Sequence, residues 1–200
     1  MDHRTPGPGT LAVIWCRSVR GISLVECLVV VCLVSILSVV AVPALRTVTD
    51  GVQQREVVGS LHEALLLARS EAIKTNARVV ICRSANGTTC AGAGGWEQGW
   101  IIFRDADNSA QREPGEVVLD TRGPMSSGWR VLPNQPFASY VSFRPDGRAA
   151  YRSGAFQAGA FTVCREGSGR VQARQLVLSS SGRPRVERLT LTACTATAAA

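Results

Sequence analysis

The first pattern along the chain is one long apolar run, from Ile22 to Leu45, that contains a single charged residue, Glu26. As a helix rising about 1.5 Å per residue, these 24 residues span roughly 36 Å, more than the roughly 30 Å hydrocarbon core of a bilayer. The run therefore predicts a transmembrane helix over residues 22–45. A carboxylate inside such a helix is costly unless it is paired, so Glu26 is a candidate functional residue.

After residue 45 the apolar residues recur at spacings of three and four, which is the period of a helix with one buried face. The charged residues largely lie off this stripe. Its members are Leu61, Ala64, Leu65, Ala68 and Ala72. The pattern predicts an amphipathic helix over residues 46–76 that packs its apolar stripe on a globular head.

Residues 77–194 change to short β-type runs separated by Gly, Pro, Asn and Ser. The candidate strands are Arg78 to Arg83, Trp100 to Arg104, Glu116 to Asp120, Trp129 to Leu132, Tyr140 to Arg144, Ala149 to Arg152, Phe161 to Arg165, Gln175 to Ser179 and Val186 to Leu191. Successive strands without helices between them imply antiparallel sheets. The expected fold is α+β, with a long N-terminal helix on a β-rich head and a flexible tail over residues 195–200.

The residues before the apolar run define a topology. They carry Arg4, Arg17 and Arg20 against one acid, Asp2. By the positive-inside rule, the N-terminus stays in the cytoplasm and everything after residue 45 crosses the membrane. The head is therefore expected on the far side of a single membrane span.

Cysteine usage agrees with export. Four of the seven cysteines, Cys82, Cys90, Cys164 and Cys194, lie in the head, where an oxidising compartment lets disulfides persist. Three pairings are possible. We expect Cys82 to pair with Cys90 around the turn between them, and Cys164 with Cys194 to clamp the C-terminal strand. No CxxC motif is present and His62 is isolated in the helix, so no metal site is expected.

The residues at the start of the apolar run resemble a known processing signal. Gly21, an apolar residue and then Ser-Leu-Val-Glu are similar to the class III signal of type IV pilins and type II secretion pseudopilins. The resemblance implies that a prepilin peptidase cuts after Gly21 and methylates Ile22, the new N-terminus. It also implies that Glu26 offsets the N-terminal amine of a neighbouring subunit during assembly. The alternatives are a plain signal-anchor helix and a capping box between Ser23 and Glu26.

Two further stretches, Ala64 to Cys82 and Gly95 to Asp105, are similar to the GspH/FimT branch of these proteins. The resemblance covers nearly the whole mature chain. It implies a minor subunit whose precursor is inserted in the inner membrane with its head in the periplasm. The subunit then joins major and minor pilins in a pilus at the cell surface. Trp96, Trp100 and Phe103 within it are expected to be core residues.

Positive charge is concentrated in the last third of the chain. Residues 46–143 hold ten basic and ten acidic residues, whereas residues 144–200 hold nine arginines and three acids, a net charge of +6. Arginine is the residue best suited to forked contacts with phosphate. Gly182 and Pro184 are expected to hold a turn that exposes Arg183 and Arg185, with Arg188 close behind.

Gly182-Arg183-Pro184-Arg185 resembles the Gly-Arg-x-Arg motif by which FimT-type minor pilins bind DNA in natural transformation. The resemblance implies a DNA-binding site in which Arg183 and Arg185 make the contacts and Gly182 shapes the loop, and we add Arg188 to it. Such a site would bind double-stranded DNA through phosphates, without sequence preference. A solvated hairpin is the alternative, because Arg-x-Arg arises readily in an arginine-rich chain.

Nothing in the sequence favours an enzyme or a cofactor. His3 lies in the leader, so no histidine is placed to activate a nucleophile. Asp105, Asp107 and Asn108 with Glu113 lack the spacing of a calcium-binding EF-hand and are expected to form a hairpin loop. The expected function is pilus biogenesis with capture of extracellular DNA. The alternatives are a type II secretion minor pseudopilin and a structural tip pilin without DNA binding.

Overall fold

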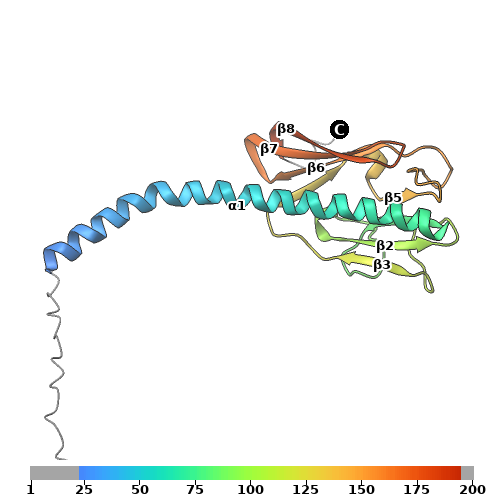
Figure 1. Cartoon of the computed structure of the whole chain (residues 1–200), viewed down its shortest axis with the longest axis horizontal. Helices are drawn as coiled ribbons and strands as arrows, with labels where there is room; N and C mark the ends of the chain where they lie inside the picture. The colour runs from blue at the N-terminus through green and yellow to red at the C-terminus, as the bar shows by residue number, and fades with distance from the viewer. Residues whose placement is uncertain (1–22, 195–200) are drawn as a thin grey trace, which may run out of the picture. The chain divides into compact units, whose positions relative to one another are not determined.

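The computed structural model describes residues 23–194, and in residues 40–44, 46 and 47 it describes the backbone alone. The described chain is α+β, as expected, with one long helix and two four-stranded antiparallel sheets (Figure 1). It divides into two compact units between Arg46 and Thr47. The predicted cleavage site at Gly21 and Ile22 and the predicted tail lie outside the described residues.

Helix α1 (Leu24–Thr75) is the only α-helix of the described residues and begins the described chain. Over residues 24–39 its side chains are exposed, and nearly all of them are apolar. Ser35 and Ser38 donate their hydroxyls to the carbonyls of Val31 and Val34, each at 2.7 Å, so these polar groups are satisfied within the helix. Taking only the residues that the structure describes, no helix is long and apolar enough to cross a membrane.

The second part of α1 buries the predicted apolar stripe. Each member of the stripe is at most 4% exposed, and the stripe extends back to Val57 and Val58. The helix ends at Thr75 because Asn76 adopts a positive φ of 47°, while the N–H of Ala77 still reaches the carbonyl of Ala72 at 3.3 Å. This is the end expected from the sequence.

Both sheets pack against this part of α1 (Figure 1). In the first sheet, the strand order is β3 (Val118–Arg122), β2 (Trp100–Asp105), β1 (Arg78–Arg83) and β5 (Tyr140–Phe143). In the second sheet, the order is β4 (Trp129–Pro133), β6 (Gly159–Arg165), β7 (Gly167–Leu178) and β8 (Pro184–Cys194). Short 3-10 helices occupy Trp96–Gln98 and Gln135–Phe137. One apolar core joins α1 to both sheets, with Trp96 and Trp100 buried in it.

Two strand predictions need correction. Ala149 to Arg152 forms no strand in the described chain and makes only two isolated bridges, Phe143 with Ala149 and Ala150 with Phe156. Strand β7 begins at Gly167, well before the predicted start at Gln175. Its first half consists of glycines and polar residues with Val171 as the one large apolar side chain, which is too little to indicate a strand. The pairing with β8 holds this half in the sheet.

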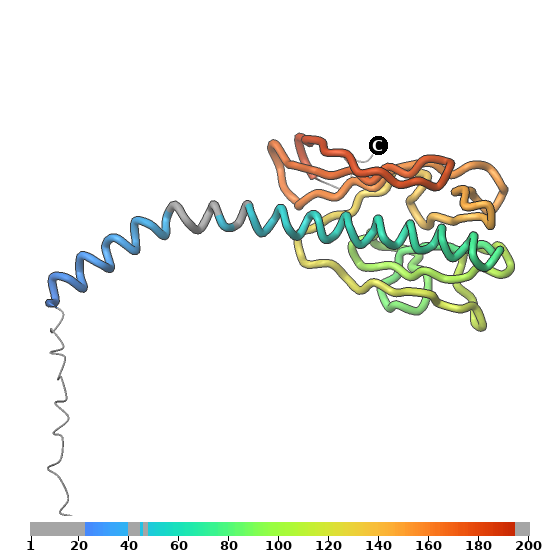
Figure 2. The backbone as a smooth tube through the Cα atoms, in the orientation of Figure 1, coloured from blue at the N-terminus to red at the C-terminus, as the bar shows by residue number. Residues whose placement is uncertain are grey.

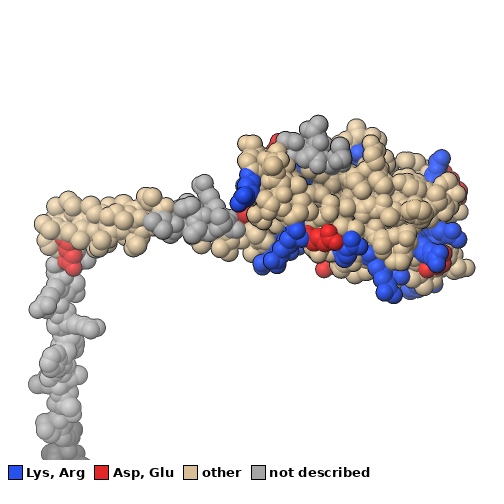
Figure 3. All heavy atoms as spheres, turned by 90° about the horizontal axis from the view of Figure 1, so that it is seen from above, with Lys and Arg blue, Asp and Glu red and all other residues tan. Residues whose placement is uncertain are grey.

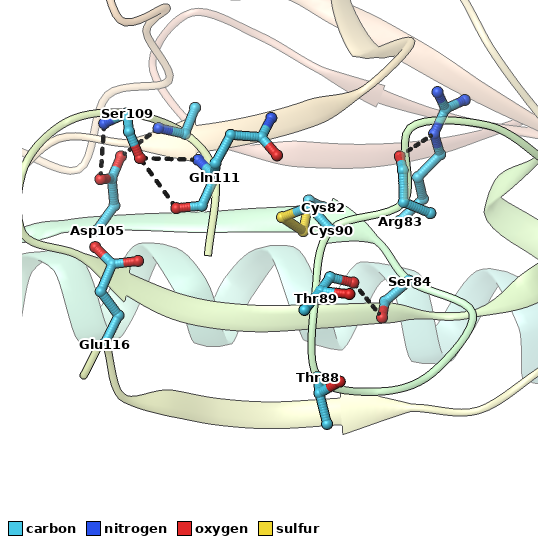
Figure 4. Close-up of a disulfide and its surroundings, with 12 residues drawn as sticks. Cys82, Arg83, Ser84, Thr88, Thr89, Cys90, Asp105, Ser109, Gln111 and Glu116 are labelled. Carbon is cyan, nitrogen blue, oxygen red and sulfur yellow. Dashed lines mark hydrogen bonds between the residues drawn. A yellow bond between two sulfur atoms is a disulfide. The ribbon is translucent and has the colours of Figure 1, made fainter. Parts of the chain in front are cut away.

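Both expected disulfides are present. Cys82 in β1 is joined to Cys90, and the bond packs beside β2 in a small core with Ile101 and Phe103 (Figure 4). Cys164 in β6 is joined to Cys194, the last residue of β8. Because β7 lies between β6 and β8 in the sheet, this second bond ties two strands that do not pair directly.

Candidate functional site

The basic C-terminal segment forms a long hairpin of β7 and β8. The two strands pair without interruption from Leu178 opposite Pro184 to Val171 opposite Leu191 and run side by side in the backbone trace (Figure 2). A tight turn over residues 179–183, called here the hairpin turn, joins them. The N–H of Gly182 donates to the carbonyl of Ser179 at 2.9 Å and closes it. The turn expected around Gly182 is thus present.

Gly182 holds the hairpin turn against the rest of the head. It is buried, has a φ of 75°, and a Cβ placed on it would lie 2.1 Å from the carbonyl oxygen of Gly147. The same oxygen accepts a hydrogen bond from Nε of Arg69 in α1 at 3.0 Å. The N–H of Ala149 donates to the carbonyl of Ser180 at 3.2 Å. Only glycine fits this approach, so the turn has a fixed place beside residues 144–149 and α1.

Arg183 and Arg185 differ in their partners. Arg183 is exposed and makes no ion pair with any residue that the structure describes. Arg185 is also exposed, but its Nε donates to a carboxylate oxygen of Glu187 at 2.7 Å. A phosphate at Arg185 would therefore compete with Glu187.

The alternation of β8 separates Arg185 from Arg188. Arg185 lies opposite Val177, on the face of the sheet away from α1, whereas Arg188 lies opposite Arg174, on the face toward α1. The proposed residues Gly182, Arg183, Arg185 and Arg188 consequently do not form one flat surface. They are divided between the hairpin turn and the two faces of its strands.

Arg188 belongs instead to a group of three arginines with Arg174 of β7 and Arg55 of α1. Burial lowers the pKa of Arg174, and the positive charges of Arg188 and Arg55 lower it further. No carboxylate of the described residues forms an ion pair with any of the three. The sequence alone does not indicate this group, because only strand register and helix packing place Arg174 and Arg55 beside Arg188.

Two further arginines lie next to the hairpin turn. Arg144 and Arg148 bracket a tight turn in which the N–H of Arg144 donates to the carbonyl of Arg148 at 2.9 Å. Arg144 approaches Asp146 at 3.9 Å, and Arg148 makes no ion pair with a described residue. The sequence places these residues about 35 positions before Arg183, so only the fold reveals the proximity.

Most of this positive charge is not neutralised within the chain. Among the described residues, the arginines after residue 143 that form ion pairs are Arg144, Arg165 and Arg185. On the face drawn in Figure 3, basic side chains follow one long edge of the head, and a few acidic side chains stand among them. The head therefore carries an electropositive edge that suits a polyanion.

The acidic residues after β2 organise a loop. Asp105 is 2% exposed, and its carboxylate accepts hydrogen bonds from the N–H groups of Ser109 and Ala110 at 3.0 and 3.1 Å (Figure 4). Burial raises the pKa of Asp105 above its ordinary value. The carboxylates of Asp107 and Glu116 lie close to that of Asp105. These bonds agree with the expected hairpin loop.

Glu26, the residue expected to act in assembly, lies in the first turn of α1, and its side chain is exposed. It makes no hydrogen bond or ion pair with another described residue. The N–H of Cys27 donates to the carbonyl of Ser23 at 3.1 Å, which starts the helix without the side-chain bonds of a capping box. The carboxylate is therefore available to a partner outside the chain.

This chain is similar to a known protein family in sequence and to solved structures of a minor pilin in fold. Residues 58–182 match the family described as type II transport protein GspH. The structure is similar to a crystal structure of FimU, a type IV minor pilin of Pseudomonas aeruginosa, with 17% sequence identity and a TM-score of 0.54 over 74% of this chain and 98% of that chain. A second crystal form of FimU matches with 17% identity and a TM-score of 0.51, over 70% of this chain and 99% of that chain. No curated protein sequence matches.

The family match ends at Gly182, so Arg183, Arg185 and Arg188 lie beyond it. The likeness to FimU, at 17% identity, concerns the fold.

Proposed function

Because the chain belongs to the GspH family, we propose that it is a minor type IV pilin whose head also binds extracellular DNA. In this proposal a prepilin peptidase cuts after Gly21, and residues 22–45 hold the precursor in the inner membrane with the head in the periplasm. The subunit then joins other pilins through Glu26 and reaches the cell surface in the pilus. The role is structural and binding, without catalysis.

The observation that carries the DNA proposal is the fixed, exposed hairpin turn with its surplus of arginine. Gly182 holds the turn in one place, and Arg183 extends from it without a carboxylate partner among the described residues. Arg144 and Arg148 add positive charge beside it. Because the backbone of the turn is already held in place, binding phosphate costs only the conformational entropy of the arginine side chains, which favours binding.

Phosphate contacts predict a particular kind of binding. Each contact displaces condensed counterions from the duplex, so affinity falls steeply as salt rises. Such contacts position a protein on the duplex but do not read bases, so binding is independent of sequence. This is the behaviour expected of a pilin that captures any DNA it meets.

Titration of the full chain, purified in detergent, with a labelled duplex at several salt concentrations tests the proposal. The double variant Arg183→Ala with Arg185→Ala should bind more weakly and lower the slope of log affinity against log salt by about 0.9 for each phosphate that the arginines no longer neutralise. The matched control is Arg170→Ala, since Arg170 is exposed at the opposite end of β7 and forms no ion pair with a described residue. An equal weakening in the double variant and the control would place the DNA site elsewhere.

A second candidate function is supported by the description of the matched family as a type II transport protein. As a secretion pseudopilin, or as a tip pilin of purely structural role, the chain would use its arginines against neighbouring subunits. Either role predicts no DNA binding even at low salt. Deletion of the gene, followed by assays of both protein secretion and DNA uptake, separates the two systems.

A further inference from the structure

A pocket of about 380 Å³ opens beside the hairpin turn. Its lining includes Arg144, Arg148, Gly154, Phe156, Ser180 and Ser181, so it joins the turn of β7 and β8 to the segment that follows β5. Ser180 is fixed in this position by the hydrogen bond that its carbonyl accepts from Ala149. The pocket combines guanidinium groups, hydroxyls and one aromatic ring.

Phe156 is the unusual member of this lining. It is 74% exposed, whereas the other four phenylalanines of the chain are completely buried. Its ring is therefore free to make contact with a ligand.

The neighbouring residue explains why Phe156 faces outward. Gln157 is fully buried: its side chain accepts a hydrogen bond from the N–H of Ser142 at 3.0 Å and donates to the carbonyls of Pro136 and Tyr140. Phe156 itself bridges Ala150 in extended conformation. Since successive side chains of extended backbone point to opposite sides, anchoring Gln157 inside holds Phe156 outside.

The polar groups of the pocket suit a phosphate. Among the described residues Arg148 forms no ion pair, and Arg144 has only the long contact with Asp146. The hydroxyl of Ser181 is bonded to that of Ser179 at 2.8 Å and can still take part in a further hydrogen bond. An aromatic ring beside two arginines is the combination that binds a base by stacking and its phosphate by charge.

We propose that this pocket binds an unstacked base of single-stranded DNA on the ring of Phe156, with the adjoining phosphate at Arg144 and Arg148. The inference rests on the proposed DNA binding and refines it. In a duplex the faces of the bases are covered by their neighbours, so Phe156 can stack only on a base that is unpaired or at a strand end. The head therefore binds single strands and frayed ends more tightly than an intact duplex of the same length.

Fluorescence anisotropy of the full chain in detergent tests the pocket with three labelled probes of about twelve nucleotides, a length that one such site covers. The probes are oligothymidine, an abasic strand with the same phosphates, and a closed duplex. Phe156→Ala should weaken oligothymidine binding by roughly fivefold or more, and leave the abasic strand and the duplex unchanged. Phe156→Trp keeps a stacking ring and should retain wild-type binding of oligothymidine.

The outcomes separate the two proposals. If the wild-type chain binds none of the probes at low salt, the proposed DNA function itself fails. If it binds all three and Phe156→Ala leaves oligothymidine unaffected, or weakens all three alike, DNA binding stands and the stacking site is wrong. Phe156 is exposed, so Phe156→Ala is expected to fold normally. Unchanged duplex binding by the variant checks this.

Discussion

At the scale of single residues, Gly182 and Gly169 allow the effect of close packing to be separated from that of backbone strain. Both have a positive φ, 75° and 88°, but a Cβ at Gly182 meets the carbonyl of Gly147, whereas a Cβ at Gly169 meets nothing within 4 Å. Gly169→Ala should lower the free energy of unfolding by about 1 kcal/mol, the strain of the backbone alone. Gly182→Ala should lower it by about 2–3 kcal/mol or more, because the turn must also move. Denaturant unfolding followed by tryptophan fluorescence measures both, and equal destabilisation would contradict the close packing.

Glu187 limits the availability of Arg185. Replacing it in Glu187→Gln frees the guanidinium and removes a negative charge near the phosphates, so duplex affinity at low salt should rise about two- to fivefold. Glu166→Gln is the matched control. It removes the same charge from an exposed carboxylate that pairs with Arg130. If both variants gained affinity equally, net charge rather than the Arg185 pair would explain the effect.

The loop after β2 predicts opposite pH dependences for two neighbouring carboxylates. Burial raises the pKa of Asp105, so the folded protein holds its proton more tightly than the unfolded chain. Its contribution to stability is complete below the ordinary value of about 4 and is lost as pH rises through the raised pKa. Hydrogen bonds from Ser109 lower the pKa of Asp107, so its contribution is present above about 4 and lost as pH falls.

Unfolding of Asp105→Asn and Asp107→Asn across the range from acid to neutral pH checks these signs. The loss of stability in Asp105→Asn should be largest at low pH, and in Asp107→Asn largest near neutral pH. An asparagine at position 105 can offer only its one amide oxygen to the two N–H donors, so some loss should persist at every pH. Parallel pH profiles for the two variants would refute the assigned pKa directions.

At the scale of elements, the two disulfides close loops of different length. Their sequence separations are 30 residues for Cys164–Cys194 and 8 residues for Cys82–Cys90. By the chain-entropy estimate, paired Cys→Ser substitution should cost about 3–4 kcal/mol for the first and about 2–3 kcal/mol for the second. Hydrogen exchange should also show β8 opening in the first variant alone, since β8 is an edge strand. A larger destabilisation on removing Cys82–Cys90 would reverse the expected order.

The strands show which elements the sequence could predict. Arg78 to Arg83 is apolar throughout its centre, is buried, and was predicted at its observed bounds. The sequence does not predict residues 167–174 as a strand, because Val171 and Ala173 alone form an apolar face among Gly, Ser, Arg and Gln. The register with β8 makes them a strand. Local pattern thus predicts strands that bury their own side chains, and it misses those that depend on a partner.

In the candidate site, too, the sequence predicts the residues whose exposure depends on local pattern and not those placed by contacts between distant segments. Gly182 and Arg183 could be found from the sequence, since a glycine, a proline and charged residues in succession indicate an exposed turn. The opposite directions of Arg185 and Arg188 follow from strand alternation once β8 is known to begin at Pro184. Arg144, Arg148 and Phe156 could not be found, because their place beside the turn depends on packing between segments distant in the sequence.

At the scale of the whole molecule, the two units have different surface chemistry. Residues 24–39 expose apolar side chains and one carboxylate, whereas the head is basic. In the proposed assembly, a neighbouring subunit neutralises the charge of Glu26, because leaving it unpaired in an apolar environment is costly. The first unit therefore suits assembly, and the head suits an anionic ligand.

Glu26→Gln tests this division of roles in cells. The variant should be cleaved and found in the membrane in normal amounts, but it should be strongly depleted from sheared filaments, because the amide cannot offset a neighbour's positive terminus. Duplex binding by its head should be unchanged. Ser35→Ala, in the same part of α1, should reach filaments normally since its hydroxyl is satisfied within the helix. Filament levels equal to wild type would contradict the assembly role of Glu26.

The bond between Cys164 and Cys194 also determines how the hairpin responds to tension. A pull along the strands on a ligand held at the hairpin turn is shared by β7 and β8, so the load passes to the hydrogen bonds between β7 and β6, which are loaded in shear rather than opened one at a time. The disulfide anchors the far end of β8 to β6, which prevents the edge strand from sliding out. In the proposed DNA-binding role, the hairpin therefore bears a load on its ligand without β8 leaving the sheet.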